Sequence, residues 1–146
     1  MRVYVDRSAL LKRAFAEAES DALEDVLHRH VEAADALVSS SLAWVEVSRA
    51  LRRRLDGEDP DVASEASEDA ISGIAERRIT PDVISLARRI SPNLLRSLDA
   101  IHLATAILID ADVLLTYDDR LAEATRANGM AVSSPTGAPD AGHEAR

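Results

Sequence analysis

The sequence predicts an α/β fold in which helices cover both faces of a small, mainly parallel sheet. Short apolar runs of strand length alternate along the chain with segments whose apolar residues recur at helical spacing. Strands that are separated by helices in this way usually pair in parallel, and both faces of such a sheet are buried. With 146 residues, 47% of them hydrophobic and 29% charged, the chain is long enough for one domain with its own core.

Capping and helix-breaking residues set the element boundaries in the first half of the chain. The serines at 39–41 can cap the helix that follows them, and Gly57 and Pro60 belong to a loop at 56–61. We therefore expect strands at 2–5 and 36–39 and helices at 8–18, 20–32, 41–55 and about 61–75.

The second half of the chain follows the same alternation. Pro81 suits the first turn of a helix, Pro92 interrupts the chain, and Gly129 ends the last helix. We expect strands at 78–80, 113–116 and 130–132 and helices at 81–90, 96–109 and 119–128. The domain should therefore span residues 1–132, and the tail at 133–146, which lacks an apolar pattern, should be disordered.

Composition excludes several classes of protein. No apolar run approaches the ~20 residues that span a bilayer, and an acid at position 6 interrupts the region where a signal peptide would be apolar. We therefore expect a cytoplasmic protein that does not enter membranes. Because the chain has no cysteine, it can form neither disulfides nor thiolate metal sites. A bound metal should therefore be a hard ion with oxygen or imidazole ligands.

The net charge of −9 argues against a nonspecific nucleic-acid coat, which depends on many basic contacts to phosphate. Lys12 is the only lysine, and the arginines cluster at 49–54, 77–78 and 88–89. Guanidinium groups suit forked contacts with phosphate or carboxylate. The alternative is that each cluster is a solvated helix face with intrahelical ion pairs.

Four acids stand at or just beyond the ends of apolar segments: Asp6, Glu46, Asp99 and Asp118. Burying a carboxylate is costly unless a cation or hydrogen-bond donors compensate it, so four such acids in a small chain suggest a shared cation. Asp6 directly follows the first strand and Asp118 follows the strand at 113–116. In a parallel sheet both lie at the carboxyl edge, where ligands bind. The hypothesis from the residues alone is a metal-dependent nuclease.

Each acid also has a structural explanation. Asp6 and Asp118 can cap the helices that follow them, and Asp99 can favour the first turn of its helix through the helix dipole. Glu46 does not fit a capping box, and its structural alternative is an ion pair with Arg49 one turn on. The helix of Asp99 is strongly apolar and carries no lysine that could pair with it.

With these acids in these segments, the sequence resembles the PIN-domain ribonucleases, in particular the toxins of VapBC-type toxin–antitoxin pairs. Four segments in the family's order carry the resemblance over about residues 1–132: YVDRSALLK at 4–12, SSLAWVEVSRAL at 40–51, LDAIHLATA at 98–106 and LLTYDDRLAEA at 114–124. It implies a PIN-like three-layer α/β/α domain. It also implies a catalytic quartet of Asp6, Glu46, Asp99 and Asp118, with metal ligands Asp6, Asp99 and Asp118 and supporting roles for Thr116, Ser8 and Asp119.

The resemblance further implies what this site does. Mg²⁺ or Mn²⁺ would activate a water for attack on a phosphodiester of RNA, with Glu46 or Asp99 accepting the proton. The expected reaction is endonucleolytic cleavage of a structured RNA, such as a transfer or ribosomal RNA, that leaves a 5′-phosphate. The expected partners are a VapB-type antitoxin and a second copy of the toxin, in a homodimer and in a heterotetramer or larger assembly with the antitoxin.

Three residues around the quartet need separate interpretation. Arg7 stands where the family usually has a small hydroxyl residue, so it either contacts the scissile phosphate or neutralises the acids and weakens metal binding. His102, three residues after Asp99, is expected to be a packed or hydrogen-bonded core residue rather than a metal ligand. Trp44 is expected in the core or facing a partner, because 3% aromatic residues provide few platforms for stacking bases.

Three other classes of protein share parts of this pattern. A phospho-acceptor receiver domain would need paired acids after the first strand and a lysine near the last. A haloacid-dehalogenase-like phosphatase would need a second aspartate where Ser8 stands. A PIN fold that only binds RNA or protein is the remaining alternative. An intact acid quartet argues against it, and a cleavage assay with added metal would decide.

Overall fold

Five short strands form one parallel sheet in the computed structural model, which describes residues 1–137. Their order across the sheet is β3-β2-β1-β4-β5. The strands are β1 (Arg2–Val5), β2 (Ala36–Ser40), β3 (Ala75–Arg77), β4 (Val113–Leu115) and β5 (Ala131–Ser133). Every pair is parallel, which confirms the predicted sheet and makes it wholly rather than mainly parallel over the described residues.

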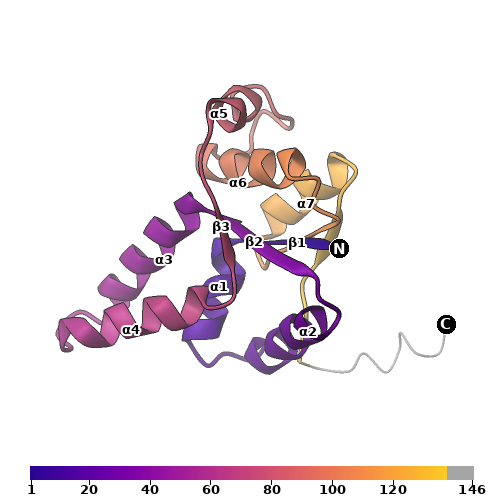
Figure 1. Ribbon diagram of the computed structural model, residues 1–146. Coiled ribbons are helices and arrows are strands. Elements are labelled where there is room, and N and C mark those ends of the chain that lie inside the picture. The colour runs from indigo at the N-terminus through magenta and orange to yellow at the C-terminus, as the bar shows by residue number, and fades with distance from the viewer. Residues whose placement is uncertain (138–146) are drawn as a thin grey trace.

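Helices cover both faces of the sheet and give the three-layer arrangement seen in Figure 1. Alternate residues of a strand point to opposite faces, so Val3 and Val5 pack in one apolar cluster and Tyr4 packs in the other. The first cluster lies under α1 (Arg7–Ala14), α2 (Ser20–Glu32), α3 (Ser41–Arg54) and α4 (Pro60–Ile71). The second lies under α5 (Pro81–Ala87), α6 (Ser97–Leu108) and α7 (Asp119–Ala127).

The strand order places the candidate acids together. β1 lies at the centre, the chain first moves outward to β2 and β3, and it then returns to β4 on the other side of β1. The strand order reverses at this point, and ligands of parallel sheets bind beyond the carboxyl ends of strands at such a reversal. Asp6 follows β1 directly, and Asp118 caps α7 just after β4.

Four expected elements differ from the structure by three or four residues. The helix expected at 8–18 ends at Ala14, because the Ser20 hydroxyl donates to the carbonyls of Lys12 and Phe15 and turns the chain there. The helix expected at about 61–75 ends at Ile71, because Gly73 adopts a φ of +78° that a continuing helix does not allow. The strand expected at 78–80 therefore lies earlier, as β3. The helix expected at 81–90 also ends early, at Ala87.

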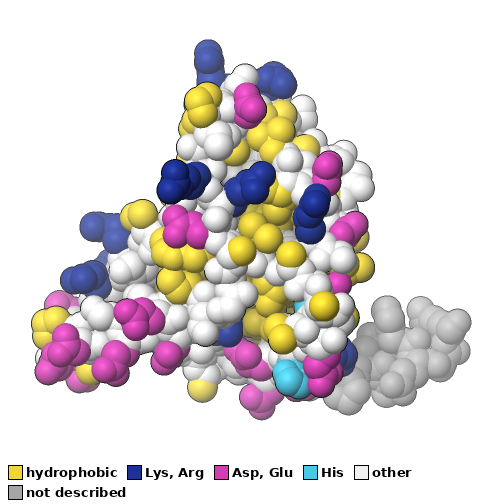
Figure 2. Space-filling model, in the orientation of Figure 1, with side chains coloured by type: hydrophobic (Ala, Val, Ile, Leu, Met, Phe, Trp, Pro, Cys, Tyr) yellow, Lys and Arg dark blue, Asp and Glu magenta, His cyan; other side chains and the backbone are white. Residues whose placement is uncertain are grey.

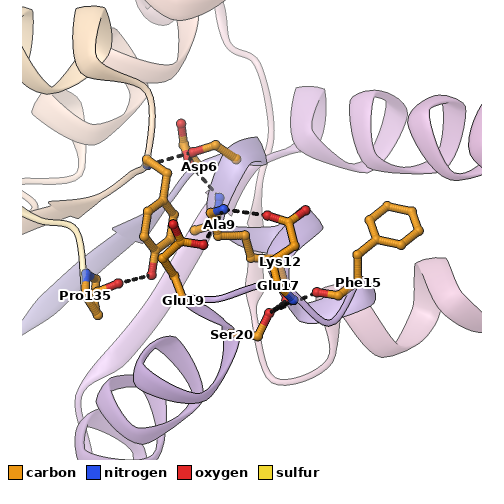
Figure 3. A network of polar contacts seen from close by, with 10 residues as sticks. Asp6, Ala9, Lys12, Phe15, Glu17, Glu19, Ser20 and Pro135 are labelled. Atoms are coloured by element: carbon orange, nitrogen blue, oxygen red, sulfur yellow. Dashed lines mark hydrogen bonds and ion pairs between the residues drawn. The ribbon is translucent and has the colours of Figure 1, made fainter. Parts of the chain in front are cut away.

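The structure describes the first residues of the expected tail, as far as residue 137. Ser133 belongs to β5 and accepts from the amide of Thr116. The Ser134 hydroxyl donates to the Thr116 carbonyl, and Tyr117 donates its hydroxyl to the Pro135 carbonyl at 2.7 Å (Figure 3). The rest of the expected tail, residues 138–146, lies outside the described residues. Within residues 1–137, no helix is long and apolar enough to cross a bilayer.

Candidate active site

Asp6 is the most buried of the four acids, with 3% of its surface exposed. Its Oδ1 accepts from the Ser8 hydroxyl at 2.7 Å and from the Ala9 amide at 3.1 Å, and its Oδ2 accepts from the Thr116 hydroxyl at 2.7 Å. Figure 3 shows Asp6 and Ala9 at the start of α1. Asp6 is thus the N-cap of α1, and capping does not remove it from the site.

Ser8 and Thr116 join the start of α1 to the loop after β4. The Ser8 hydroxyl accepts from the amide of Tyr117 at 2.8 Å, and the Thr116 hydroxyl accepts from the amide of Asp118 at 3.0 Å. Because each hydroxyl also donates to Asp6, the two aspartates are held at one edge of the sheet. The supporting role expected for Ser8 and Thr116 requires such contacts between their hydroxyls and Asp6.

Asp118 caps α7 through one of its two oxygens. Its Oδ1 accepts from the amides of Arg120 at 2.9 Å and Leu121 at 3.1 Å. The next residue, Asp119, is exposed in the first turn of α7. Of the two adjacent acids, Asp118 is therefore the one that the fold holds beside Asp6.

Asp99 lies half-buried in the first turn of α6 and is electrostatically coupled to the other acids. Burial raises its pKa most, and the negative charges of Asp118 and Asp6 raise it further, while the positive charge of Arg7 opposes the shift. Burial also raises the pKa of Asp6, although hydrogen bonds from Ser8 and Thr116 oppose this. The ionised forms of both acids are therefore costly in the protein alone, which is the condition that a nearby cation relieves.

Glu46 projects from α3 with 9% of its side chain exposed. Its Oε1 lies 2.5 Å from His102 Nε2, and its Oε2 lies 4.0 Å from an Arg7 guanidinium nitrogen. The ion pair with Arg49 that the spacing allowed is not formed between these two described residues. His102 is itself buried and hydrogen-bonded, which confirms that it is a core histidine.

The donors at this edge suit a hard divalent ion, because they are carboxylate oxygens in a crowded, partly buried setting. Among the described residues, however, no group of three or more His, Asp or Glu side chains comes close enough to hold a metal ion. The acids thus converge on one edge of the sheet without closing into a complete cage. Their chemistry fits Mg²⁺ or Mn²⁺ with several ligand positions left to water, as is usual for Mg²⁺.

Comparison with known proteins identifies the family. A model of the PIN domain matches residues 3–127. The chain belongs to the PIN-domain family. Ribonuclease VapC46 of Mycobacterium tuberculosis is 42% identical to it over 136 residues, which cover 92% of this chain and 98% of that protein. The chain is accordingly a VapC-like member of the PIN-domain family.

Solved structures share this PIN-domain fold at low sequence identity. VapBC2 from Rickettsia felis, bound to a DNA fragment from its promoter, superposes with a TM-score of 0.72 at 11% identity, over 91% of this chain and 98% of the solved chain. M. tuberculosis VapC20, a toxin that cleaves the sarcin–ricin loop, superposes with a TM-score of 0.64 at 15% identity, over 84% and 94%.

Sequence reasoning missed one residue at this PIN-domain site. Tyr4 is fully buried in β1, and its hydroxyl lies 2.6 Å from His102 Nδ1. The available signal was a tyrosine within an otherwise aliphatic strand, together with a histidine in a strongly apolar helix, since two such polar groups need partners once they are buried. Trp44 packs against the apolar cluster under α1–α4, which agrees with a core role.

Proposed function

We propose that this PIN-domain protein is a Mg²⁺- or Mn²⁺-dependent endoribonuclease and the toxin of a type II toxin–antitoxin pair. The observation that carries the proposal is the placement of Asp6 and Asp118 at the carboxyl edge of the sheet, where Ser8 and Thr116 join them and where burial raises the pKa of Asp6 and of the neighbouring Asp99. Such crowding of acids destabilises the protein alone and becomes useful only when a cation binds among them.

The acids and the two hydroxyl residues have different roles in the proposed cleavage of RNA. Asp6, Asp99 and Asp118 would hold the divalent ion, which lowers the pKa of water and neutralises charge developing on the phosphodiester. Glu46 receives the proton of the attacking water at Oε2, because Oε1 is already occupied by His102. Ser8 and Thr116 keep the Asp6 carboxylate oriented through their hydroxyls.

Exposed arginines near the acids bind the phosphate backbone of the RNA. Glu46, Asp99 and Asp118 each have an exposed arginine within one helical turn in the sequence, and these are Arg49, Arg96 and Arg120. Guanidinium groups bind phosphate oxygens in a forked geometry, so they can engage the RNA backbone on either side of the scissile bond. We propose a structured RNA as the substrate, which is consistent with the sarcin–ricin loop that VapC20 cleaves.

An antitoxin would inhibit by supplying positive charge where the metal binds. Structural neighbours such as VapBC2 are toxin–antitoxin complexes, which supports a VapB-type partner for this chain. A basic side chain of the antitoxin, placed among the acids, would be stabilised by the same electrostatics as the metal. We expect co-expression with a cognate VapB-type antitoxin to relieve toxicity and give a stable complex, in which the toxin is a homodimer. Failure on both counts would contradict the toxin assignment.

Wild-type protein freed of antitoxin tests the enzymatic proposal. It should cleave a sensitive RNA when Mg²⁺ or Mn²⁺ is present, stop when a chelator is added, and resume when excess Mn²⁺ is restored. The new 5′ ends should carry phosphate. RNA binding without cleavage under all these conditions would instead identify a non-catalytic PIN module.

A further inference from the structure

A chain of hydrogen bonds crosses the core behind the acids and ends at Glu46. The Ser40 amide donates to the Tyr4 hydroxyl at 3.2 Å, this hydroxyl lies 2.6 Å from His102 Nδ1, and His102 Nε2 lies 2.5 Å from Glu46 Oε1. The groups come from the end of β2, from β1, from α6 and from α3. Tyr4 is fully buried and His102 is 1% exposed, so neither can touch a substrate.

Each hydrogen bond in this series is donated in the direction from Ser40 toward Glu46. A backbone amide can only donate, so the Tyr4 oxygen accepts from Ser40 and its own proton is free to point at His102 Nδ1. The imidazole then carries its proton on Nε2 and donates it to the Glu46 carboxylate.

We propose that Tyr4 and His102 are positioning residues that hold Glu46 with Oε1 tied down, so that Oε2 alone acts in the cleft. The inference rests on the proposed function, because it assigns how Glu46 is held for that reaction. A glutamate has three side-chain torsions, and fixing one oxygen removes most of that freedom before substrate binds. It also limits how far Glu46 can turn toward Arg7, whose guanidinium lies 4.0 Å from Oε2.

Two substitutions at one position separate positioning from simple packing. In His102→Gln the side-chain amide nitrogen can reach the place of Nε2 and still donate to Glu46. In His102→Asn the amide can reach only the place of Nδ1, beside Tyr4. Both variants remove the ring from the same buried site, so a purely structural role predicts similar losses in both.

We expect His102→Asn to lower kcat about tenfold or more without raising KM for RNA, because misplacing a proton acceptor reduces the rate and not the binding. His102→Gln should recover most of this loss. Tyr4→Phe, which leaves Glu46 untouched and frees His102 to change tautomer, should lower kcat in the same direction. Equal kcat in wild type and all three variants would overturn the proposal, and so would equal losses in His102→Gln and His102→Asn.

The tautomer of His102 gives a readout that does not need RNA cleavage. Nitrogen-15 NMR of the wild-type protein should show the imidazole proton on Nε2, and Tyr4→Phe should weaken that preference. A ring protonated at Nδ1 would overturn the proposed direction of donation. If the wild type shows the Nε2 tautomer but cleaves no RNA with any divalent ion, the proposed function fails while the placement of Glu46 stands.

Discussion

At the scale of single residues, buried carboxylates govern both stability and chemistry. Asp99 has a raised pKa in the folded protein, because burial and the charges of Asp118 and Asp6 disfavour its ionised form. An acid whose pKa rises on folding stabilises the fold at low pH. This contribution is complete below the ordinary pKa near ~4 and is lost as the pH rises through the raised value.

Asp99→Asn should therefore stabilise the metal-free protein at neutral pH. An amide removes the repulsion, and we expect Tm to rise by about 2–4 °C, which corresponds to roughly 1 kcal/mol for a chain of this size. Scanning calorimetry in a chelator measures the difference, which should shrink toward pH 4, where the wild-type carboxyl is protonated. An Asp99→Asn protein that is less stable than wild type at pH 7 would show that repulsion is not the dominant effect there.

Arg7 offers a second test at this scale. Its guanidinium lies 4.0 Å from Glu46 Oε2, and its charge lowers the pKa of Asp99, which favours the neutralising role over the phosphate-binding one. Arg7→Ser should then lower the Kd for Mn²⁺ about fivefold, or roughly 1 kcal/mol, in a calorimetric titration.

The matched control for this titration is Arg126→Ser, which removes an exposed arginine at the far end of α7 and should leave Mn²⁺ binding unchanged. If Arg7→Ser instead weakens RNA binding and leaves Mn²⁺ affinity as it was, Arg7 grips the substrate phosphate.

The sequence predicted that Asp6 and Asp118 lie at one edge of the sheet, because each follows a strand. Glu46 lies inside α3, and supporting roles for Ser8 and Thr116 were implied only by the family resemblance. Sequence reasoning did not find the role of Tyr4. The contact between Tyr4 and His102 joins residues 98 positions apart and depends on how α6 lies on the sheet, so no local pattern in the chain carries it.

At the scale of elements, the alternation of strand and helix was sufficient to predict the parallel sheet. The boundaries were less predictable where one side chain or one glycine ended a helix. Ser20 bonds back to two carbonyls of the preceding turn, and Gly73 takes a positive φ after α4. Both features depend on the folded geometry of a short connection, whereas apolar spacing alone would let either helix continue.

Asp118 both caps α7 and belongs to the acidic site, so two substitutions separate its roles. Asn accepts a capping bond about as well as Asp, whereas Ala does not. We expect Asp118→Asn, which keeps the capping bond and removes the repulsion with Asp99, to unfold with at least the free energy of the wild type, and Asp118→Ala to be about 1 kcal/mol less stable than Asp118→Asn in urea denaturation. Both should lose RNA cleavage. Cleavage by Asp118→Asn at the wild-type rate would remove Asp118 from the catalytic set.

At the scale of the whole molecule, a net charge of −9 must be reconciled with an RNA substrate. In Figure 2 acidic side chains gather over α4, whereas Lys and Arg side chains lie over other parts of the visible face, with further acidic side chains among them. Local arginines near the acids therefore have to supply the attraction for phosphate, and each arginine that binds phosphate should affect the salt dependence of binding.

Arg96→Ala and Arg120→Ala should each weaken RNA binding and flatten its dependence on salt, by about one unit in the log–log slope for each phosphate that the arginine binds. Arg126→Ala, on the same helix as Arg120 but at its other end, is the matched control. Fluorescence anisotropy in the presence of a chelator measures binding without cleavage. Equal slopes for all three variants would show that RNA binds to a different surface of the molecule.

We propose above that a cation held by the acids at the sheet edge makes this PIN-domain protein cleave RNA. The most direct measurement is the single-turnover rate of RNA cleavage with Mn²⁺ for wild type, Asp99→Asn and Asp61→Asn. Asp61 is also a first-turn aspartate, but it lies exposed on α4, away from the site. We expect Asp61→Asn to cleave like wild type and Asp99→Asn, although folded, to lose at least about a hundredfold in cleavage rate. Equal rates for Asp99→Asn and wild type would contradict the proposal.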